Sequence, residues 1–148
     1  MKYLLIVMLM ISSLSSKAQK IYSFNQLDSL QNIEKKNIIV FVSASWCNYC
    51  KAMDETVFKE PAIIKLLDQQ YYFVELNAED QTPIVYQNHK FSFNPSLGFH
   101  EMAIILANKQ KLTFPSIYIL TNANEILYQH KGFIKATNLF KVLNNIKY

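Results

Sequence analysis

The feature that most constrains this chain is a strand-like run of residues that leads into a pair of cysteines. Residues 40–44 are Val-Phe-Val-Ser-Ala, a mostly β-branched and aromatic run that predicts a buried strand. Small polar residues follow, and Cys47 then stands at the start of a helical segment. Cys47 and Cys50 are the two cysteines of the 148-residue chain, and their spacing places both sulfurs on one helical turn. The pattern predicts a reactive dithiol between a strand and a helix.

The start of a helix gives Cys47 its expected chemistry. Unpaired N–H groups and the helix dipole favour negative charge there, so the sulfur is stabilised as the reactive thiolate. A free cysteine titrates near ~8.5, and this setting commonly lowers the pKa to roughly 3.5–7.5. We expect Cys47 to be the attacking nucleophile, and Cys50, less exposed inside the helix, to resolve the mixed disulfide. A purely structural disulfide is the alternative, but it would close too short a loop to stabilise much.

Two segments resemble known active-site elements. Residues 44–51, Ala-Ser-Trp-Cys-Asn-Tyr-Cys-Lys, resemble the redox segment of the thioredoxin family. Residues 113–116, Thr-Phe-Pro-Ser, precede an apolar run and resemble the cis-proline loop that faces the redox pair in that family. The resemblance extends from about Ile21 to the C-terminus. It implies an α/β thioredoxin-like fold, in which helices flank a central mixed β-sheet.

The same resemblance assigns a substrate-binding surface around the two sulfurs. Trp46 would shield one side of the site, and Phe114 would offer backbone groups to an extended substrate next to a cis Pro115. Asn48 and Tyr49 stand between the cysteines, where a histidine often marks strong oxidants of the family. Because no imidazolium is present there, we expect a reductase-like or isomerase-like potential.

One position departs from the family pattern. Thioredoxins carry a buried aspartate six residues before the first cysteine, where it helps to deprotonate the second cysteine, and here that position is Phe41. Glu75 on the expected third strand is a candidate proton acceptor in its place. The alternative interpretation, a surface glutamate at the end of a strand, is equally open.

The N-terminus has the pattern of a secretory signal peptide. Lys2 precedes an apolar run over residues 3–14, and residues 16–18 offer a small-x-small cleavage site. An uncleaved anchor is the alternative, but a membrane span needs about 20 apolar residues. We therefore expect residues 1–18 to be a signal peptide that is cleaved after Ala18. Residues 19–148 would form one thioredoxin-like domain that is periplasmic or secreted.

Hydrophobic periodicity and turn residues predict the remaining elements. An insertion at about residues 81–99 would form a β-hairpin around Asn88-His89, ahead of the helix that leads to the proline loop. The apolar faces would include Ile33 in the first helix and Ile105 in the helix after the insertion. The expected helices are 25–35, 47–58, 62–68, 100–107 and 135–147; the expected strands are 19–24, 38–44, 72–77, 116–120 and 126–131.

The composition limits the partners and cofactors. All 15 basic residues are lysines, and arginine, which grips phosphates and guanine with a planar fork, is absent; this argues against nucleic-acid binding. The lysines are spread along the sequence, which predicts a solvated surface. We expect no metal and no cofactor besides the Cys47–Cys50 disulfide, because no histidine lies at ligand spacing from the cysteines. The three histidines are His89, His100 and His130.

The leading hypothesis is an exported thiol–disulfide oxidoreductase that reduces or isomerises protein disulfides through the Cys47/Cys50 couple. We expect a monomer that acts on a protein disulfide and is recharged by a membrane-borne or other thiol redox partner. Two alternatives stay open at this stage. One is a module that holds a soft metal, Cu(I) or Zn, between two thiolates, and the other is a non-catalytic interaction protein with a thioredoxin fold.

Overall fold

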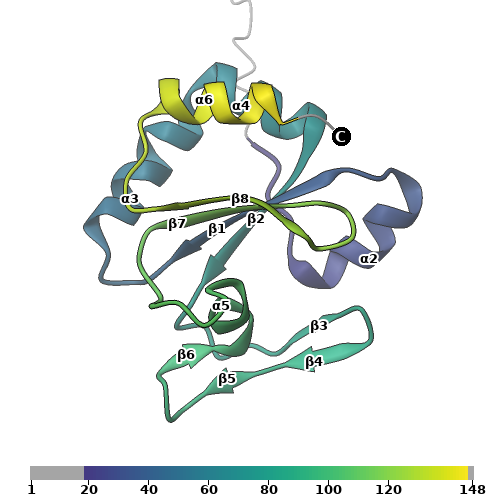
Figure 1. Ribbon diagram of the computed structural model, residues 1–148, viewed down its shortest axis with the longest axis vertical. Helices are drawn as coiled ribbons and strands as arrows, with labels where there is room; N and C mark the ends of the chain where they lie inside the picture. The colour runs from purple at the N-terminus through teal and green to yellow at the C-terminus, as the bar shows by residue number, and fades with distance from the viewer. Residues whose placement is uncertain (1–18, 147–148) are drawn as a thin grey trace, which may run out of the picture.

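The structure is a computed structural model that describes residues 19–146, so the expected signal peptide lies outside the described residues (Figure 1). No described helix is long and apolar enough to cross a membrane. The helical elements are α2 (Phe24–Ile33), α3 (Asn48–Glu55), the 3-10 turn η1 (Val57–Lys59), α4 (Pro61–Gln70), α5 (Glu101–Leu106) and α6 (Ala136–Asn145). The strands are β1 (Asn37–Ser43), β2 (Tyr71–Asn77), β3 (Ile84–Tyr86), β4 (His89–Phe91), β5 (Phe93–Asn94), β6 (Phe99–His100), β7 (Ser116–Leu120) and β8 (Ile126–Lys131).

A four-stranded mixed sheet forms the centre of the domain. The strand order is β2-β1-β7-β8, with β1 parallel to β2 and antiparallel to β7. In the register of β1, Val40 lies opposite Val74 on one side and Tyr118 on the other. All of β1 except its last residue is buried, which explains its nearly continuous apolar sequence. The sheet agrees with the predicted α/β class.

Two hydrophobic clusters cover the two faces of this sheet. Figure 1 shows α4 and α6 on one side of the sheet and α5 on the other. Alternate residues of β1 point to opposite faces, so Ile39 and Phe41 join one cluster while Ile38 and Val40 join the other. The first cluster includes side chains from α3, α4 and α6, and also the two cysteines. The second cluster includes side chains from α2, α5 and the insertion. The redox pair therefore belongs to the cluster of α3, whereas the β3–β4 pair belongs to the cluster on the other face.

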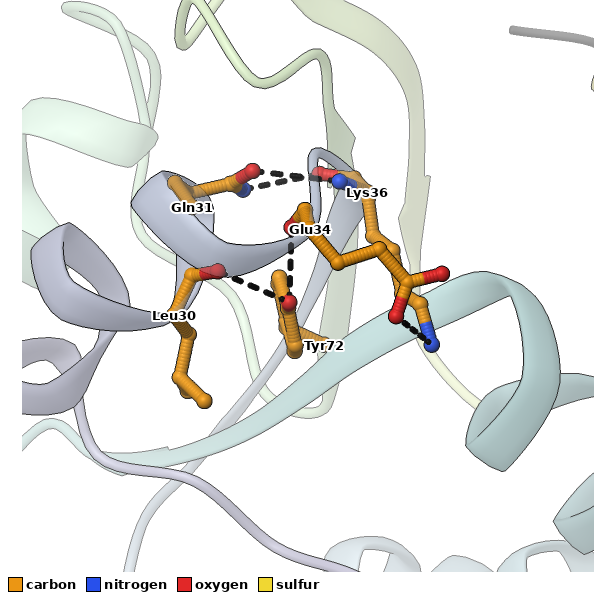
Figure 2. Close-up of polar contacts among 5 residues, drawn as sticks. All are labelled: Leu30, Gln31, Glu34, Lys36 and Tyr72. Carbon is orange, nitrogen blue, oxygen red and sulfur yellow. Dashed lines mark hydrogen bonds and ion pairs between the residues drawn. The ribbon is translucent and has the colours of Figure 1, made fainter.

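The end of α2 is fastened to the sheet by polar contacts (Figure 2). The Tyr72 hydroxyl of β2 donates to the carbonyl oxygens of Leu30 and Glu34, at 3.1 and 2.7 Å. The Gln31 side-chain amide bonds both the N–H and the carbonyl of Lys36, at 3.1 and 2.8 Å. Burial raises the pKa of the Tyr72 hydroxyl, and the Glu34 carboxylate raises it further. The Leu30 carbonyl also accepts the Glu34 N–H at 2.9 Å, whereas the Glu34 carbonyl, at the C-cap of α2, gains from Tyr72 a partner outside the helix.

The insertion contains two short antiparallel pairs, β3–β4 and β5–β6. Gln87 and Asn88 form the β3–β4 turn with φ of 50° and 60°, the left-handed region that suits a tight hairpin. The first pair is held to α2, because the Val85 N–H donates to the Asn25 side-chain oxygen at 2.8 Å. Tyr86 is buried in the second cluster. The hairpin thus extends the core and leaves the sheet order unchanged.

Three predictions for individual elements were wrong. Residues 19–24 form no strand, only an isolated bridge between Tyr22 and Val74. Ile33 is 84% exposed because α2 ends there, and Ile105 is 56% exposed on the outer side of α5. The other expected helices and strands are present; β7 and β8 have the predicted ends, and the ends of the rest differ by a few residues.

Candidate functional site

The redox pair lies at the start of α3, after the loop that follows β1. Cys47 is the N-cap residue of α3, and its sulfur accepts a hydrogen bond from the Cys50 N–H at 3.1 Å. Cys47 and Cys50 form a disulfide with their Cα atoms 5.2 Å apart. Both residues are only 4% exposed, so the expected lower exposure of Cys50 was wrong. The disulfide joins two residues of one helical turn, and both residues are buried.

The loop before Cys47 is held by a carboxylate that the sequence analysis missed. Glu79 accepts the backbone N–H of Ser45 at 2.7 Å, and this hydrogen bond is the largest cause of a lowered Glu79 pKa. A hydrogen bond from the Trp46 side chain lowers that pKa further. Parallel β1 and β2 end at the same edge, with Ser43 opposite Asn77, so residues just after β2 must face the cysteine loop. That rule could have identified Glu79 from the sequence.

The proline loop forms a second wall of the site. The Phe114–Pro115 peptide bond is cis, and Pro115 is buried. The Ser116 hydroxyl donates to the Thr113 carbonyl at 2.6 Å, and the Gly132 N–H donates to the Pro115 carbonyl at 2.7 Å. The loop after β8 is thereby joined to the proline loop.

A chain of aromatic rings joins the cysteine loop, the proline loop and the insertion. Trp46 is 64% exposed and meets the Phe114 ring edge-on, with centroids 5.7 Å apart. Phe114 packs against both hydrophobic clusters and meets the Phe99 ring of β6 at 5.5 Å. Phe99 was not among the predicted site residues, and its contact makes the insertion part of the rim of the site.

The residues between the cysteines face solvent. Asn48 is exposed, and Tyr49 is 69% exposed with its ring 6.3 Å from the ring of Phe133. Phe133 follows Gly132 in the loop after β8 and is itself partly exposed. The rim above the buried sulfurs is therefore aromatic on two sides.

The position that is aspartate in thioredoxins is filled by a ring. Phe41 is 3% exposed, and its ring packs against that of Phe58 with the centroids 4.8 Å apart. No acidic group therefore lies at this position. Glu75 pairs with Phe41 across the β1–β2 ladder and has an exposed side chain. Partial desolvation raises the pKa of the Glu75 carboxyl, the Asp54 carboxylate raises it further, and the Lys59 ammonium lowers it. The structure records no hydrogen bond between Glu75 and either cysteine.

The hydrogen bonds of the three histidines join groups other than the two cysteines. His100 is buried, where its Nδ1 accepts the Met102 N–H at 3.1 Å and its Nε2 lies 3.2 Å from the Thr82 carbonyl oxygen. His89 and His130 contact the Gln87 and Phe133 carbonyls. Within residues 19–146, no three His, Cys, Asp or Glu side chains gather in a way that could hold a metal ion.

A family model described as a thioredoxin-like domain matches residues 24–147. The chain belongs to the thioredoxin-like family. Within the matched range, β1 ends at Ser43, the redox pair follows at the start of α3, and the cis Pro115 comes after the insertion. No curated protein matches the sequence.

Solved structures similar to this thioredoxin-like protein share its fold at low identity. DsbH oxidoreductase is 16% identical with a TM-score of 0.60, and the match covers 89% of this chain and 87% of DsbH. A thioredoxin from Thermus thermophilus is 16% identical with a TM-score of 0.60, covering 85% of each chain. The reduced DsbD C-terminal domain of Neisseria meningitidis is 15% identical with a TM-score of 0.56, covering 82% of this chain and 90% of that domain. The predicted fold is confirmed, and fold and Cys47–Cys50 pair together support thiol–disulfide oxidoreductase activity.

Proposed function

We propose that this thioredoxin-like protein is an exported enzyme that reduces or isomerises disulfides of protein substrates. The observation that carries the proposal is the position of Cys47, whose sulfur is the N-cap acceptor of the Cys50 N–H at 3.1 Å. After reduction the same N–H can bond a Cys47 thiolate, and the helix dipole adds to this stabilisation. Cys47 would therefore be the nucleophile.

The reaction is a pair of thiol–disulfide exchanges. The Cys47 thiolate attacks one sulfur of the substrate disulfide, that S–S bond breaks, and the other substrate sulfur leaves and takes a proton. Cys50 then loses its proton and attacks the Cys47 sulfur, which releases the second substrate thiol. The substrate gains two electrons and two protons, and Cys47 and Cys50 lose them as their disulfide closes.

The surrounding residues are proposed to bind the substrate and to move the proton. Trp46, Phe114 and Tyr49 would hold apolar parts of an extended polypeptide, and Asn48 would face it in solvent. The backbone beside the cis Pro115 would pair with it. Glu75 is the proposed proton acceptor for Cys50, acting through water, since its raised pKa makes it a stronger base than an ordinary glutamate.

The cellular setting is part of the proposal. The charged and apolar pattern of residues 1–18 supports export into a periplasmic or extracellular space. After each reduction the Cys47–Cys50 disulfide must regain two electrons, and we propose a membrane-borne or other thiol partner as their source. We propose that the protein acts as a monomer.

The reduction potential of the couple, measured by equilibration with glutathione, tests the direction of this activity. No imidazole stands between Cys47 and Cys50, so we expect a value between about −270 and −180 mV, with catalysis of insulin reduction. A value near about −120 mV would mark a strong oxidase and contradict the proposal. A Cys50→Ala variant would retain substrates as mixed disulfides with Cys47 and thereby identify them.

A further inference from the structure

The last third of this chain carries its excess of positive over negative charge. Residues 102–148 contain six lysines and a single acidic residue, Glu125. The other ten acidic residues all lie earlier in the chain. The proline loop and the loop after β8 both belong to this last third. The position of the excess positive charge on the domain therefore depends on how these loops fold.

Two of these lysines flank the proline loop. Lys131 ends β8 directly opposite Ser116, the residue after Pro115. Its Nζ donates to the Gln110 side-chain oxygen at 2.7 Å and lies 3.5 Å from the carbonyl oxygen of Lys111. Both side chains are exposed, so Lys111 and Lys131 stand beside one another at the redox edge of the sheet.

A third lysine stands on the other side of the aromatic rim. Lys135 is the N-cap residue of α6 and is exposed. It follows by two residues Phe133, whose ring meets that of Tyr49 between the cysteines. Lys51, also exposed, lies one helical turn beyond Cys47. We call Lys111, Lys131 and Lys135 the lysine rim.

The charges of the lysine rim are not neutralised by the domain itself. Within the part of the chain that the structure describes, the ion pairs are Lys36 with Glu34 and Lys59 with Asp54. Glu79, the acidic side chain at the cysteine loop, lies after β2 and is bonded to Ser45. Glu125 lies in the β7–β8 turn, at the opposite end of β7 from Ser116. Lys111, Lys131 and Lys135 are all exposed, as the prediction of a solvated lysine surface requires.

We propose that the lysine rim selects, as substrate, an extended cystine-containing polypeptide segment with aspartate or glutamate residues close to its cysteine. This inference rests on the proposed function, because the segment must reach Cys47 to be reduced. Unpaired charges of one sign beside a reactive group raise the local concentration of oppositely charged substrates. Lysine suits this task because its flexible stem lets one charge meet carboxylates at several positions.

The test compares peptide disulfides that differ in charge alone. Each substrate is a symmetric disulfide of a short peptide in which two aspartates, two serines or two lysines flank the cysteine. The reduced full-length domain reacts with each in a single turnover, and closure of the Cys47–Cys50 disulfide is followed by tryptophan fluorescence. The exchange is the one written above, with two electrons passing from the protein to the peptide. We expect the aspartate peptide to react about tenfold faster than the serine peptide at low ionic strength, and the lysine peptide to be slowest.

Salt and matched variants decide whether the lysine rim is the cause. Raising the salt to about 0.5 M should bring the three rates together, because the screening length then falls well below 10 Å. A triple variant that combines Lys111→Gln, Lys131→Gln and Lys135→Gln should lose the preference for the aspartate peptide even at low salt. Lys51 is retained, since it lies beside Cys47 and would alter the thiolate. The control Lys35→Gln, Lys65→Gln, Lys90→Gln changes the net charge equally at exposed sites elsewhere and should keep the preference.

The outcomes separate this inference from the proposed function. Bis(2-hydroxyethyl) disulfide is small and neutral, so every variant should reduce it at the same rate. If no variant reduces it, the proposed function fails. If all reduce it but the wild-type chain does not distinguish aspartate from lysine peptides, or if the control variant loses the preference as well, the lysine rim has no selective role. The salt series needs no variant, so a folding defect in a variant would not leave the proposal without a test.

Discussion

The Glu79 carboxylate accepts the backbone N–H of Ser45 at 2.7 Å and so ties the end of β2 to the loop that carries Cys47. This hydrogen bond is short, and the Glu79 carboxylate is not one of the reacting groups. Glu79 is therefore a positioning residue. Its partner Ser45 precedes the exposed Trp46, so the same bond also orients the aromatic side of the site. Loss of this bond should loosen the loop while the helix that holds Cys50 stays in place.

Glu79→Ala should slow the reduction of peptide disulfides by Cys47, by up to about 100-fold, the effect of an ångström-scale displacement of a reacting group. Glu79→Gln keeps an acceptor for the Ser45 N–H and should retain more of the rate. Single-turnover kinetics of both reduced variants measure the difference. Equal rates for Glu79→Ala and wild type would show that the loop keeps its position without the carboxylate.

The lowered pKa of Glu79 gives this contact a defined pH dependence. In the unfolded chain the carboxyl titrates near 4.5, and in the folded chain it titrates lower because the Ser45 N–H favours the charged form. The stabilisation is therefore complete above pH 4.5 and is lost as the pH falls through the folded value. The difference in urea midpoint between wild type and Glu79→Ala should stay constant at neutral pH and close in acid. A difference that persists unchanged in acid would assign it to another contact.

Phe99→Ala should weaken substrate binding and leave thiol chemistry intact. The variant removes the ring that meets Phe114 at 5.5 Å, and such a ring pair is worth about 0.5–1.5 kcal/mol beyond the area that it buries. We expect a higher KM for peptide disulfides and an unchanged rate with bis(2-hydroxyethyl) disulfide. Leu97→Ala is the matched control, since Leu97 lies in the β5–β6 loop, two residues before Phe99, and is 57% exposed. Equal effects of the two substitutions would rule out a specific role for the ring.

Glu75→Gln should slow the second exchange, in which Cys50 displaces the substrate from Cys47. The substitution removes the proposed proton acceptor, so the rate of that step should increase less steeply with pH. It should also raise stability at neutral pH. The Glu75 pKa is raised on folding, so the folded state loses stability relative to the unfolded state as the pH increases beyond 4.5. Rapid-mixing kinetics across pH, with unfolding midpoints at neutral and acid pH, measure both effects; unaltered kinetics would dispose of the proton-acceptor role.

Tyr72→Phe should destabilise the domain by about 1 kcal/mol without affecting exchange, because the hydrogen bonds from the Tyr72 hydroxyl to the carbonyls of Leu30 and Glu34 are lost. The urea midpoint should fall with little change in its slope. Tyr22→Phe is the control, since the Tyr22 ring meets Tyr72 edge-on at 5.3 Å and the change leaves that ring in place. An equal loss in both variants would show that the two hydrogen bonds of the Tyr72 hydroxyl are not the cause.

The parts of the fold that local patterns specify were predicted well. β7 and β8 match their predicted bounds because polar residues separate two apolar runs, and Asn124 in their turn takes the left-handed conformation with φ of 67°. The β3–β4 turn was predicted one residue late, at Asn88-His89, while the structure uses Gln87 and Asn88. Ser23 and Gln26 together set the start of α2, because the Ser23 N–H donates to the Gln26 side-chain oxygen at 2.9 Å.

The parts of the site that depend on tertiary contacts were found only from the structure. Cys47, Cys50, Trp46 and the proline loop stand out through their local motifs. Phe99 reaches Phe114 because the β5–β6 pair folds back over the proline loop, and no local period of the sequence encodes that contact. The lysine rim was missed for the same reason, since Lys111 and Lys131 are brought together by the pairing of β7 and β8.

The pKa of the Cys47 thiol in the reduced chain tests the central claim most directly. Alkylation by iodoacetamide as a function of pH, with a Cys50→Ala variant to isolate one sulfur, gives the value. The account predicts that Cys47 is modified before Cys50 in the wild-type chain and titrates within roughly 3.5–7.5, well below the ordinary ~8.5. A Cys47 that stays unmodified and protonated at neutral pH would contradict it.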